Sequence, residues 1–298
     1  MSVVIFGEVL ADVFPDQTVL GGAPFNVARH LQAFGASPVM ISRTGMDGLG
    51  ETLLANMHRL GMSCAGMQRD AQRPTGQVRV TFVDEGHRFE ILPDQAYDHV
   101  CPETTRQVVR ALRPRLAYFG TLAQRQPSSR LALQAMLDAC ECPLFMDINL
   151  RAPWYDVEVI EYSLHAADIV KLNDEELAVI SGLLGLGSAD AERQAQALQQ
   201  RFSLQQVLVT CGAAGSWLLD EKRRVHRVGP AVGDGGLVDT VGAGDAYAAV
   251  FILGRLLGWH VDEAMQRAST YAAAICRIRG AVPDEPVFFE PYRQAWGA

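Results

Sequence analysis

Near the C-terminal end of the chain, three small residues precede an acid and a long apolar segment. They are Gly242, Ala243 and Gly244, followed by Asp245 and the apolar run 246–253. This spacing predicts a buried helix whose first backbone amides are uncrowded and available to an anion. A carboxylate beside such amides suits a base that removes a proton while the amides hold the developing charge. Phosphoryl transfer needs that arrangement.

The same stretch has a simpler interpretation as a loop that turns into a helix. Glycines permit a sharp turn, and the helix dipole favours an acid such as Asp245 in the first helical turn. On this stretch alone, both interpretations stay open.

A second glycine-rich motif lies near the N-terminus. Gly21 and Gly22 lead through Ala-Pro-Phe to Asn26 and a segment, 27–34, with apolar residues at helical spacing. A pair of glycines lets the backbone approach a ligand closely, and the Asn26 amide is both a donor and an acceptor. A helix-capping asparagine is the alternative. Asp12 lies upstream, in a segment too short for another helix.

Around these motifs, buried-strand patterns alternate with helical patterns. Strands are expected at 3–7, 38–42, 116–120, 143–147, 169–172 and 207–210, and helices at 47–60, 103–112, 128–139, 173–180, 189–200 and 261–279. This alternation predicts an α/β fold with a parallel sheet. Because no repeat, low-complexity segment or linker interrupts it, we expect a single domain over residues 1–298.

Two segments alternate polar and apolar residues instead. The first is Thr75–Leu92, around a turn at Asp84-Glu85-Gly86, and the second joins 216–219 to 224–228. Such strand pairs with one solvated face are antiparallel hairpins. The first hairpin predicts a small sheet added to the domain, with an edge hairpin of the main sheet as the alternative.

Polar residues follow two of the predicted strands. Asp147-Ile148-Asn149-Leu150-Arg151 ends one strand, and Asn173-Asp174-Glu175-Glu176 follows the next. In open α/β sheets, ligands bind at the carboxyl ends of the strands. Acids at the start of the helix after residue 173 would equally serve its dipole.

Composition and missing motifs exclude several classes of protein. The net charge of −8 argues against a nucleic-acid partner. No basic signal-peptide region and no apolar run of the roughly 18 residues needed for a membrane span is found, so we expect a soluble, cytoplasmic protein with its six scattered cysteines reduced and buried. No lysine follows a glycine, which excludes a P-loop, and no G-x-G-x-x-G opens a helix after a strand.

In combination, Gly21–Ala28 and Asp239–Tyr247 resemble the two signature motifs of the ribokinase-like (PfkB) sugar kinases. Asn173-x-x-Glu176 and Thr210-x-Gly212-x-x-Gly215 also fall where that family has them, so the resemblance covers nearly the whole chain. The first motif and Asp-Ile-Asn-Leu-Arg are most similar to bacterial fructokinases. The resemblance implies a mostly parallel central sheet flanked by helices, with a small β-sheet lid from about 12–20 and 75–92.

The resemblance also implies roles for individual residues. Asp245 would be the general base, and Gly242, Ala243, Gly244 and the Asp245 amide would form the anion hole. Asp12, Gly22 and Asn26 would bind sugar hydroxyls, with Asn149 and Arg151 adding contacts. Asn173, Thr210, Gly212 and Gly215 would line ATP. Glu176 would help to order Mg²⁺ through water, and Asp239 would help to hold a monovalent cation such as K⁺, with carbonyls near 275–281.

The function that this resemblance implies is ATP-dependent phosphorylation of a sugar hydroxymethyl group, with fructose to fructose 6-phosphate as the first candidate. Ribokinase, 2-keto-3-deoxygluconate kinase and nucleoside kinase are alternatives within the family. A non-catalytic sugar or nucleotide sensor and a nicotinamide-dependent oxidoreductase are alternatives from other classes. A homodimer formed through the exposed lid sheet stays open, and the run 233–236 has no role beyond its position next to the site.

Overall fold

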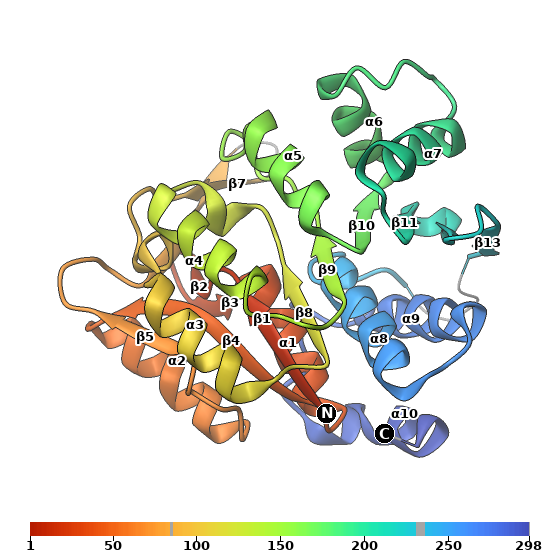
Figure 1. The fold of residues 1–298 in the computed structure, drawn as a ribbon. Coiled ribbons are helices and arrows are strands. Elements are labelled where there is room, and N and C mark those ends of the chain that lie inside the picture. Colours follow the sequence, from red (N-terminus) through yellow and green to blue (C-terminus); the bar gives the residue numbers. More distant parts are fainter. Residues whose placement is uncertain (84–85, 231–235, 298) are drawn as a thin grey trace.

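The computed structural model describes residues 1–83, 86–230 and 236–297, and its fold is drawn in Figure 1. The expected turn at Asp84-Glu85 and residues 233–235 of the run before the second motif lie outside the described residues. The chain builds two sheets, and helices cover both faces of the larger one.

The larger sheet is mostly parallel, which confirms the predicted α/β class. Its strands are β1 (Ser2–Phe6), β4 (Ser37–Gly45), β5 (Met67–Asp70), β8 (Leu116–Phe119), β9 (Leu144–Asp147), β10 (Ile169–Asn173), β11 (Gln206–Thr210), β12 (Ser216–Leu219) and β13 (Val225–Val228). They lie in the order β13-β12-β11-β10-β9-β8-β1-β4-β5. Strand β12 pairs antiparallel with both β11 and β13, and β12 and β13 correspond to the second predicted hairpin.

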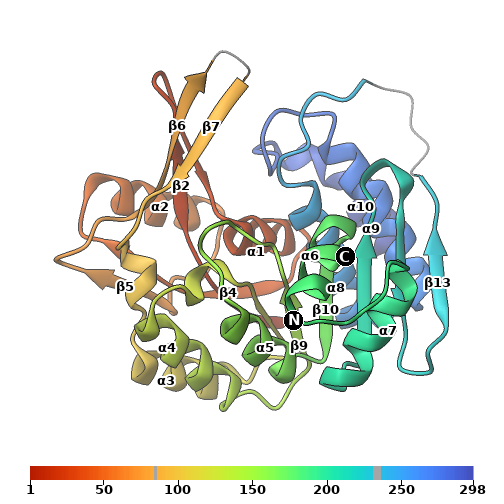
Figure 2. The same cartoon turned by 90° about the horizontal axis from the view of Figure 1, so that it is seen from above.

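Helices form a layer on each face of this sheet (Figures 1 and 2). One layer holds α1 (Ala23–Ala33), α2 (Gly48–Arg59), α8 (Ala243–Leu257) and α9 (Val261–Ile275), with α10 (Glu290–Trp296) beside it. The other holds α3 (Pro102–Leu112), α4 (Pro127–Leu137), α5 (Val157–Ala166), α6 (Asp174–Leu183) and α7 (Ala191–Phe202). Val3 and Ile5 pack into the first layer and Val4 and Phe6 into the second. Strand β1 is continuously apolar because both of its faces are covered.

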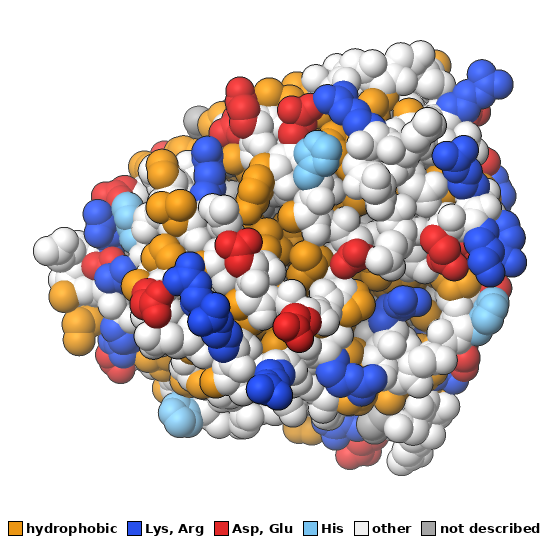
Figure 3. All heavy atoms as spheres, in the orientation of Figure 1, with side chains coloured by type: hydrophobic (Ala, Val, Ile, Leu, Met, Phe, Trp, Pro, Cys, Tyr) orange, Lys and Arg blue, Asp and Glu red, His pale blue; other side chains and the backbone are white. Residues whose placement is uncertain are grey.

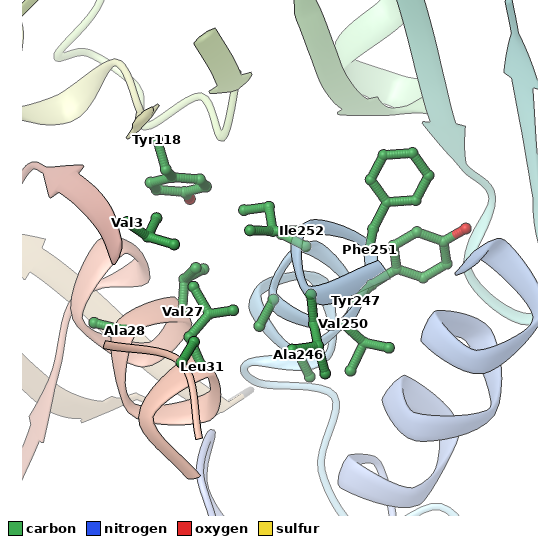
Figure 4. Close-up of a cluster of buried hydrophobic side chains, with 14 of the residues drawn as sticks. Val3, Val27, Ala28, Leu31, Tyr118, Ala246, Tyr247, Val250, Phe251 and Ile252 are labelled. Carbon is green, nitrogen blue, oxygen red and sulfur yellow. The ribbon is translucent and has the colours of Figure 1, made fainter. Parts of the chain in front are cut away.

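Helices α1 and α8, which carry the two glycine motifs, pack against each other. Figure 4 shows Val27 and Leu31 of α1 facing Ala246 and Ile252 of α8. All four side chains are fully buried. This packing fixes the two helix starts relative to each other, although more than 200 residues separate them.

The smaller sheet consists of β2 (Leu10–Val13), β3 (Thr18–Gly21), β6 (Gly76–Val83) and β7 (Gly86–Ile91), in the order β3-β2-β6-β7. Strands β2 and β6 are parallel, and the other two pairs are antiparallel. Figure 2 shows β2, β6 and β7 projecting from the body of the molecule. The first predicted hairpin therefore belongs to an added sheet rather than to the edge of the main one.

Several boundaries differ from the sequence-based expectation. Helix α1 begins at Ala23, before the expected position 27. Pro24 is compatible with a first helical turn, and Gly22, with φ +105°, has a non-helical backbone conformation directly before it. Helix α9 ends at Ile275 instead of 279, because the carbonyl of Cys276 accepts bonds from the amides of Val238 and Asp239. Strand β5 and helices α5 and α10 were not predicted.

The cysteines and the charged side chains lie partly at the surface. All six cysteines are free thiols, as expected, but they are half-buried rather than fully buried. On the face seen in Figure 3, acidic and basic side chains are interspersed rather than gathered into a field of one sign. None of the helices in the described part of the chain has the length and apolarity needed to cross a bilayer.

Candidate active site

The start of α8 is the centre of the candidate site. Its cap, Gly242, has φ +78°, and a Cβ atom there would lie 2.4 Å from the Cβ of Ala281. Glycine is therefore required both by the backbone conformation and by the close approach of the 281 loop. The Ala243 amide donates to the Thr240 carbonyl at 3.3 Å. Helix geometry leaves the next amides, of Gly244 and Asp245, without intrahelical acceptors.

Asp245 contacts the other glycine motif directly. Asn26 in the first turn of α1 donates from Nδ2 to Oδ2 of Asp245 at 2.9 Å. The Oδ1 atom of Asn26 is buried and accepts no bond from the residues that the structure describes. The amide is thus oriented by the carboxylate and presents a free acceptor inside the site.

The carboxyl group of Asp245 is tuned for proton transfer. Burial raises its pKa to about 6, even though the hydrogen bond from Asn26 and the charge of Lys171 lower it. The negative charge of Asp147 adds to the increase. A carboxylate whose pKa lies near neutrality is a stronger base than an ordinary aspartate and is still ionised at pH 7.

Two further acids share the surroundings of Arg151 with Asp245. Asp12 lies on strand β2 of the small sheet, and burial raises its pKa to about 6, while Arg151 lowers it. Glu8 is buried directly after β1, and burial raises its pKa to about 7. A hydrogen bond from its own backbone amide and the charge of Arg151 lower the pKa. Asn149 holds a left-handed backbone, with φ +42°, at the turn before Arg151. Asp12, Asn149 and Arg151 were predicted from the sequence as site residues, whereas Glu8 was not.

Gly22 has a steric role next to this group of acids. A Cβ atom at Gly22 would lie 2.7 Å from the carbonyl oxygen of Glu8. The glycine therefore lets the start of α1 lie against the backbone that follows β1.

A buried ion pair beneath the start of α8 was also missed. Lys171 Nζ lies 2.9 Å from both carboxylate oxygens of Asp147, and the Tyr118 hydroxyl donates to Oδ2 at 3.4 Å. A Cβ atom at Gly244 would lie 3.6 Å from Lys171 Nζ, so the cation is directly behind the expected anion hole. The sequence could have indicated this pair, because a lysine inside an apolar strand requires a buried partner of opposite charge.

At the end of β10, Asn173 and Glu176 form a reciprocal cap at the start of α6. Asn173 Oδ1 accepts from the Glu176 amide at 2.7 Å, and Glu176 Oε2 accepts from the Asn173 amide at 2.8 Å. Glu176 Oε1 also accepts from the Leu150 amide at 2.8 Å. The Glu176 carboxylate thus links the segments that follow β9 and β10. The observed contacts are those of a helix cap, which was the alternative interpretation of the acids at this helix start.

Thr210 ends β11 and lies opposite Asn173 in the parallel register. After it, Gly212 and Gly215 have φ +51° and +99°. A Cβ atom at Gly215 would lie 2.1 Å from the carbonyl oxygen of Val228, so β13 excludes any larger residue there. The space around a Cβ of Gly212 is open. The turn therefore leaves exposed backbone beside the ends of β10 and β11.

Asp239 connects the loop before α8 to the segment after α9. Its Oδ1 accepts from the Val241 amide at 3.0 Å and its Oδ2 from the Gly280 amide at 3.2 Å. This brings the carboxylate to the 275–281 segment, where the resemblance places the carbonyl ligands of a monovalent cation. Within residues 1–83, 86–230 and 236–297, no three His, Cys, Asp or Glu side chains converge as metal ligands.

These contacts connect some of the predicted site residues to one another. Asn26 and Asp245 touch, Gly244 lies over Lys171, and Lys171 precedes Asn173, which faces Thr210 across the sheet. One end of this chain of contacts presents acids, an amide and an arginine, which suits a polyol. The other end presents glycines and helix starts, which suit phosphate groups. A base lies between them.

The sequence matches a known family over most of its length. The profile of the pfkB family carbohydrate kinases matches residues 3–287. A fructokinase of Escherichia coli is 28% identical over 285 residues, covering 91% of this chain and 90% of that protein.

Solved structures share the fold. The fructokinase of Xylella fastidiosa, solved with bound ATP, superposes with a TM-score of 0.83 over 98% of this chain and 99% of its own, at 20% identity. A fructokinase double mutant from Vibrio cholerae O395, solved with fructose, ADP and a potassium ion, gives a TM-score of 0.78 at 22% identity, covering 94% of this chain and 93% of that one. At these identities the likeness concerns the fold alone.

Proposed function

The chain belongs to the pfkB family of carbohydrate kinases, and on that premise we propose that it transfers the γ-phosphoryl group of ATP to the hydroxymethyl oxygen of a sugar, with fructose as the first candidate. The observation that carries the proposal is the 2.9 Å contact between Asn26 and Asp245. It joins a sugar-side amide to a carboxylate at the start of a helix whose amides face the same site.

In the proposed reaction, Asp245 accepts the proton of the attacking hydroxyl group. Its raised pKa makes it a better base, and Asn26 fixes which carboxylate oxygen remains available, because Oδ2 already accepts from the amide. The hydroxyl oxygen then bonds to the γ-phosphorus as the bond to the β-γ bridging oxygen breaks, and ADP leaves with that oxygen.

Charge on the transferring group is stabilised by backbone amides at the start of α8. Gly244 and Asp245 supply these donors, while the Ala243 amide is engaged with Thr240. Lys171, paired with Asp147 behind Gly244, would present the positive end of a fixed ion-pair dipole without needing to contact the substrate. Preorganised dipoles and charges of this kind lower the barrier because they need no reorganisation during the reaction.

The sugar would be held between the two sheets. Asn26 Oδ1 accepts from one hydroxyl group, and Asp12 on the small sheet accepts from another. Arg151 offers donors from the end of β9, and Gly22 keeps the backbone close. Closure of the small sheet as a lid would exclude water, which would otherwise compete as phosphoryl acceptor.

ATP would lie along the ends of β10 and β11, with Asn173, Thr210, Gly212 and Gly215 beside its phosphates. Glu176 fits an outer role toward Mg²⁺, since both its oxygens accept backbone amides and keep lone pairs for water. Asp239 fits a charge-balancing role beside a monovalent cation, because it lies against the 276–280 backbone. Bound Mg²⁺ would neutralise charge on the phosphates.

Fructose is preferred because the N-terminal motif and the Escherichia coli relative both point to fructokinases. Enzymes that are 28% identical can act on different substrates, so the test also includes ribose, 2-keto-3-deoxygluconate and nucleosides. Purified protein with ATP and Mg²⁺ should release ADP with fructose faster than with these alternatives. A different preferred sugar would correct the substrate, and no turnover with any of them would refute the kinase activity. Calorimetric sugar binding without turnover would instead favour a sensor.

A further inference from the structure

One turn beyond Asn26 along α1, the structure contains a second concave site that the proposed reaction does not use. It is a cavity of about 300 Å³ between α1, the end of α2, the 282–289 segment and α10. Its polar lining includes Arg29, Arg59, Arg293 and Asp284, and Pro286 and Phe289 form part of its apolar wall. Its volume lies at the lower end of the range for small-molecule sites.

The charges of this cavity are unbalanced, with three guanidinium groups and one carboxylate. Arg29 Nη2 lies 3.1 Å from Asp284 Oδ1, and Arg59 Nη2 lies 3.6 Å from the same oxygen. The Asp284 side chain is 70% exposed, whereas that of Arg29 is only 9% exposed. The mostly solvated carboxylate of Asp284 is therefore the shared partner of the buried Arg29 and of Arg59.

Arg29 is incompletely satisfied in this arrangement. Its Nε atom is buried and has no hydrogen-bond partner within the part of the chain that the structure describes. Burial lowers its pKa, and the nearby charge of Arg59 lowers it further, while Asp284 acts in the opposite direction. Both effects indicate a guanidinium group that lacks negative charge around it.

We propose that this cavity binds a phosphate group, carried either by inorganic phosphate or by a small phosphate ester. Guanidinium groups bind phosphate oxygens through paired, charge-assisted hydrogen bonds, which suits a cavity lined by Arg29, Arg59 and Arg293. The bound dianion would replace Asp284 beside Arg59, and Asp284 would lose little because most of its surface is already in water. The apolar wall at Pro286 and Phe289 leaves room for the carbon skeleton of an ester.

The cavity is distinct from the active site but shares two segments with it. Helix α1 carries both Asn26 and Arg29, and the 280–284 segment contacts both places. Within that segment, Gly280 donates to Asp239, and the carbonyl of Ala281 bonds His30 Nε2 at 3.1 Å. Because phosphate could also bind at the active site, the test depends on variants that alter only the second cavity.

The experiment is calorimetric titration of the full chain with inorganic phosphate and, separately, with fructose 6-phosphate, at constant ionic strength and with a non-hydrolysable ATP analogue present. Arg59→Gln should weaken binding about tenfold, because it removes one charge-assisted contact. Asp284→Asn should strengthen binding several-fold, because it removes the competing carboxylate. Arg106→Gln is the matched control, since this arginine is 37% exposed and pairs with Glu103 on α3; it should change nothing.

The opposite signs of the two variants are the decisive result, since loss of folding could only weaken binding in both. Thermal melting without phosphate checks that each variant is folded. The probe that binds more tightly identifies the source of the phosphate group. Failure of both probes to bind at millimolar concentration, or binding that neither Arg59→Gln nor Asp284→Asn alters, would overturn the proposal. Neither result depends on turnover, so the proposed kinase activity is tested separately.

Discussion

At the scale of the residue, Asp245 combines two demands that conflict. A base needs a high affinity for protons, and burial provides it by making the ionised carboxylate costly in the folded protein. Asn26 and Lys171 limit that cost by a hydrogen bond and by charge. The same carboxylate should therefore assist turnover and reduce stability.

Asp245→Asn tests the first effect. The variant keeps the shape of the side chain and an oxygen that accepts from Asn26, but it cannot take a proton. Turnover should fall by roughly two to four orders of magnitude, the usual contribution of a general base, while ATP affinity is retained. Steady-state kinetics and calorimetry measure the two quantities. A rate equal to that of the natural protein would remove Asp245 from the mechanism.

The second effect is a gain in stability in the same variant. The pKa of Asp245 is raised from 3.8 to about 6, so its favourable contribution to folding is present below about pH 4 and is lost as the pH rises through 6. Asparagine does not ionise, so the variant should be more stable by about 3 kcal/mol at pH 7.5. Urea unfolding at pH 7.5 and pH 5 should show a smaller difference at pH 5. Equal differences at both pH values would contradict this origin.

The pH dependence of kcat/KM follows from the same group. Below about pH 6 the base is protonated, so kcat/KM should fall by about tenfold per pH unit. Asp12 and Glu8, with pKa values of about 6 and 7, titrate in the same region. The assignment to Asp245 therefore requires that the acidic limb disappear from the residual activity of Asp245→Asn. A limb that persists in the variant would belong to another group.

At the scale of the element, the two ends of α8 provide a matched pair of glycines. Gly242 and Gly258 have φ +78° and +77°, but a Cβ atom would meet Ala281 at 2.4 Å only at Gly242, while the space at Gly258 is open. Gly258→Ala should cost only the conformational penalty of about 1–2 kcal/mol and leave turnover unchanged. Gly242→Ala should cost more, because it pushes the 281 loop away, and it should lower kcat. Equal losses in both variants would show that the loop adapts.

The ion pair of Asp147 and Lys171 holds the ends of β9 and β10 beneath α8. Its side chains are only 2% and 7% exposed, so loss of one partner leaves a buried charge unpaired. Lys171→Met and Asp147→Asn should each cost about 3–5 kcal/mol in urea unfolding, and the double variant should cost much less than their sum. The exposed pair of Arg79 and Glu90 is the control, where glutamine substitutions should cost at most about 1 kcal/mol. Additive losses at the buried pair would contradict this coupling.

At the scale of the whole molecule, local patterns predicted the elements but not the contacts between them. Apolar runs and hairpin alternation gave the mostly parallel sheet and the added small sheet, because both patterns reflect which faces are buried. The contact between Asn26 and Asp245 joins residues 219 positions apart, and only the packing of α1 on α8 creates it. No spacing in the sequence encodes that distance.

The missed residues have the same explanation. Lys171 lies inside an apolar strand, and Glu8 lies directly after one. A buried charged group requires a partner, so a charged residue in or beside an apolar run predicts that a partner exists. Which residue is the partner depends on the order of the strands in the sheet. Lys171 finds Asp147 because β9 and β10 are neighbours in the sheet.

The arrangement of the two sheets leads to a prediction about closure. Asp12 lies on β2, paired with Val19 and Val78 inside the small sheet, whereas Asn26 and Asp245 lie over the large one. A sugar that contacts both groups must link the sheets, but ATP along β10 and β11 need not. Sugar binding should therefore slow hydrogen exchange of the amides of β2 and β6, and an ATP analogue alone should not.

Asp12→Asn separates this link from the rest of the site. Its amide replaces a carboxylate that accepts a sugar hydroxyl, so the KM for the sugar should rise by about tenfold while that for ATP is retained. The sugar-dependent protection of β2 and β6 should decrease in parallel. If an ATP analogue alone protects these strands, or if a sugar that is turned over leaves their exchange unchanged, the small sheet does not close over the sugar. The exclusion of water would then depend on segments around the larger sheet.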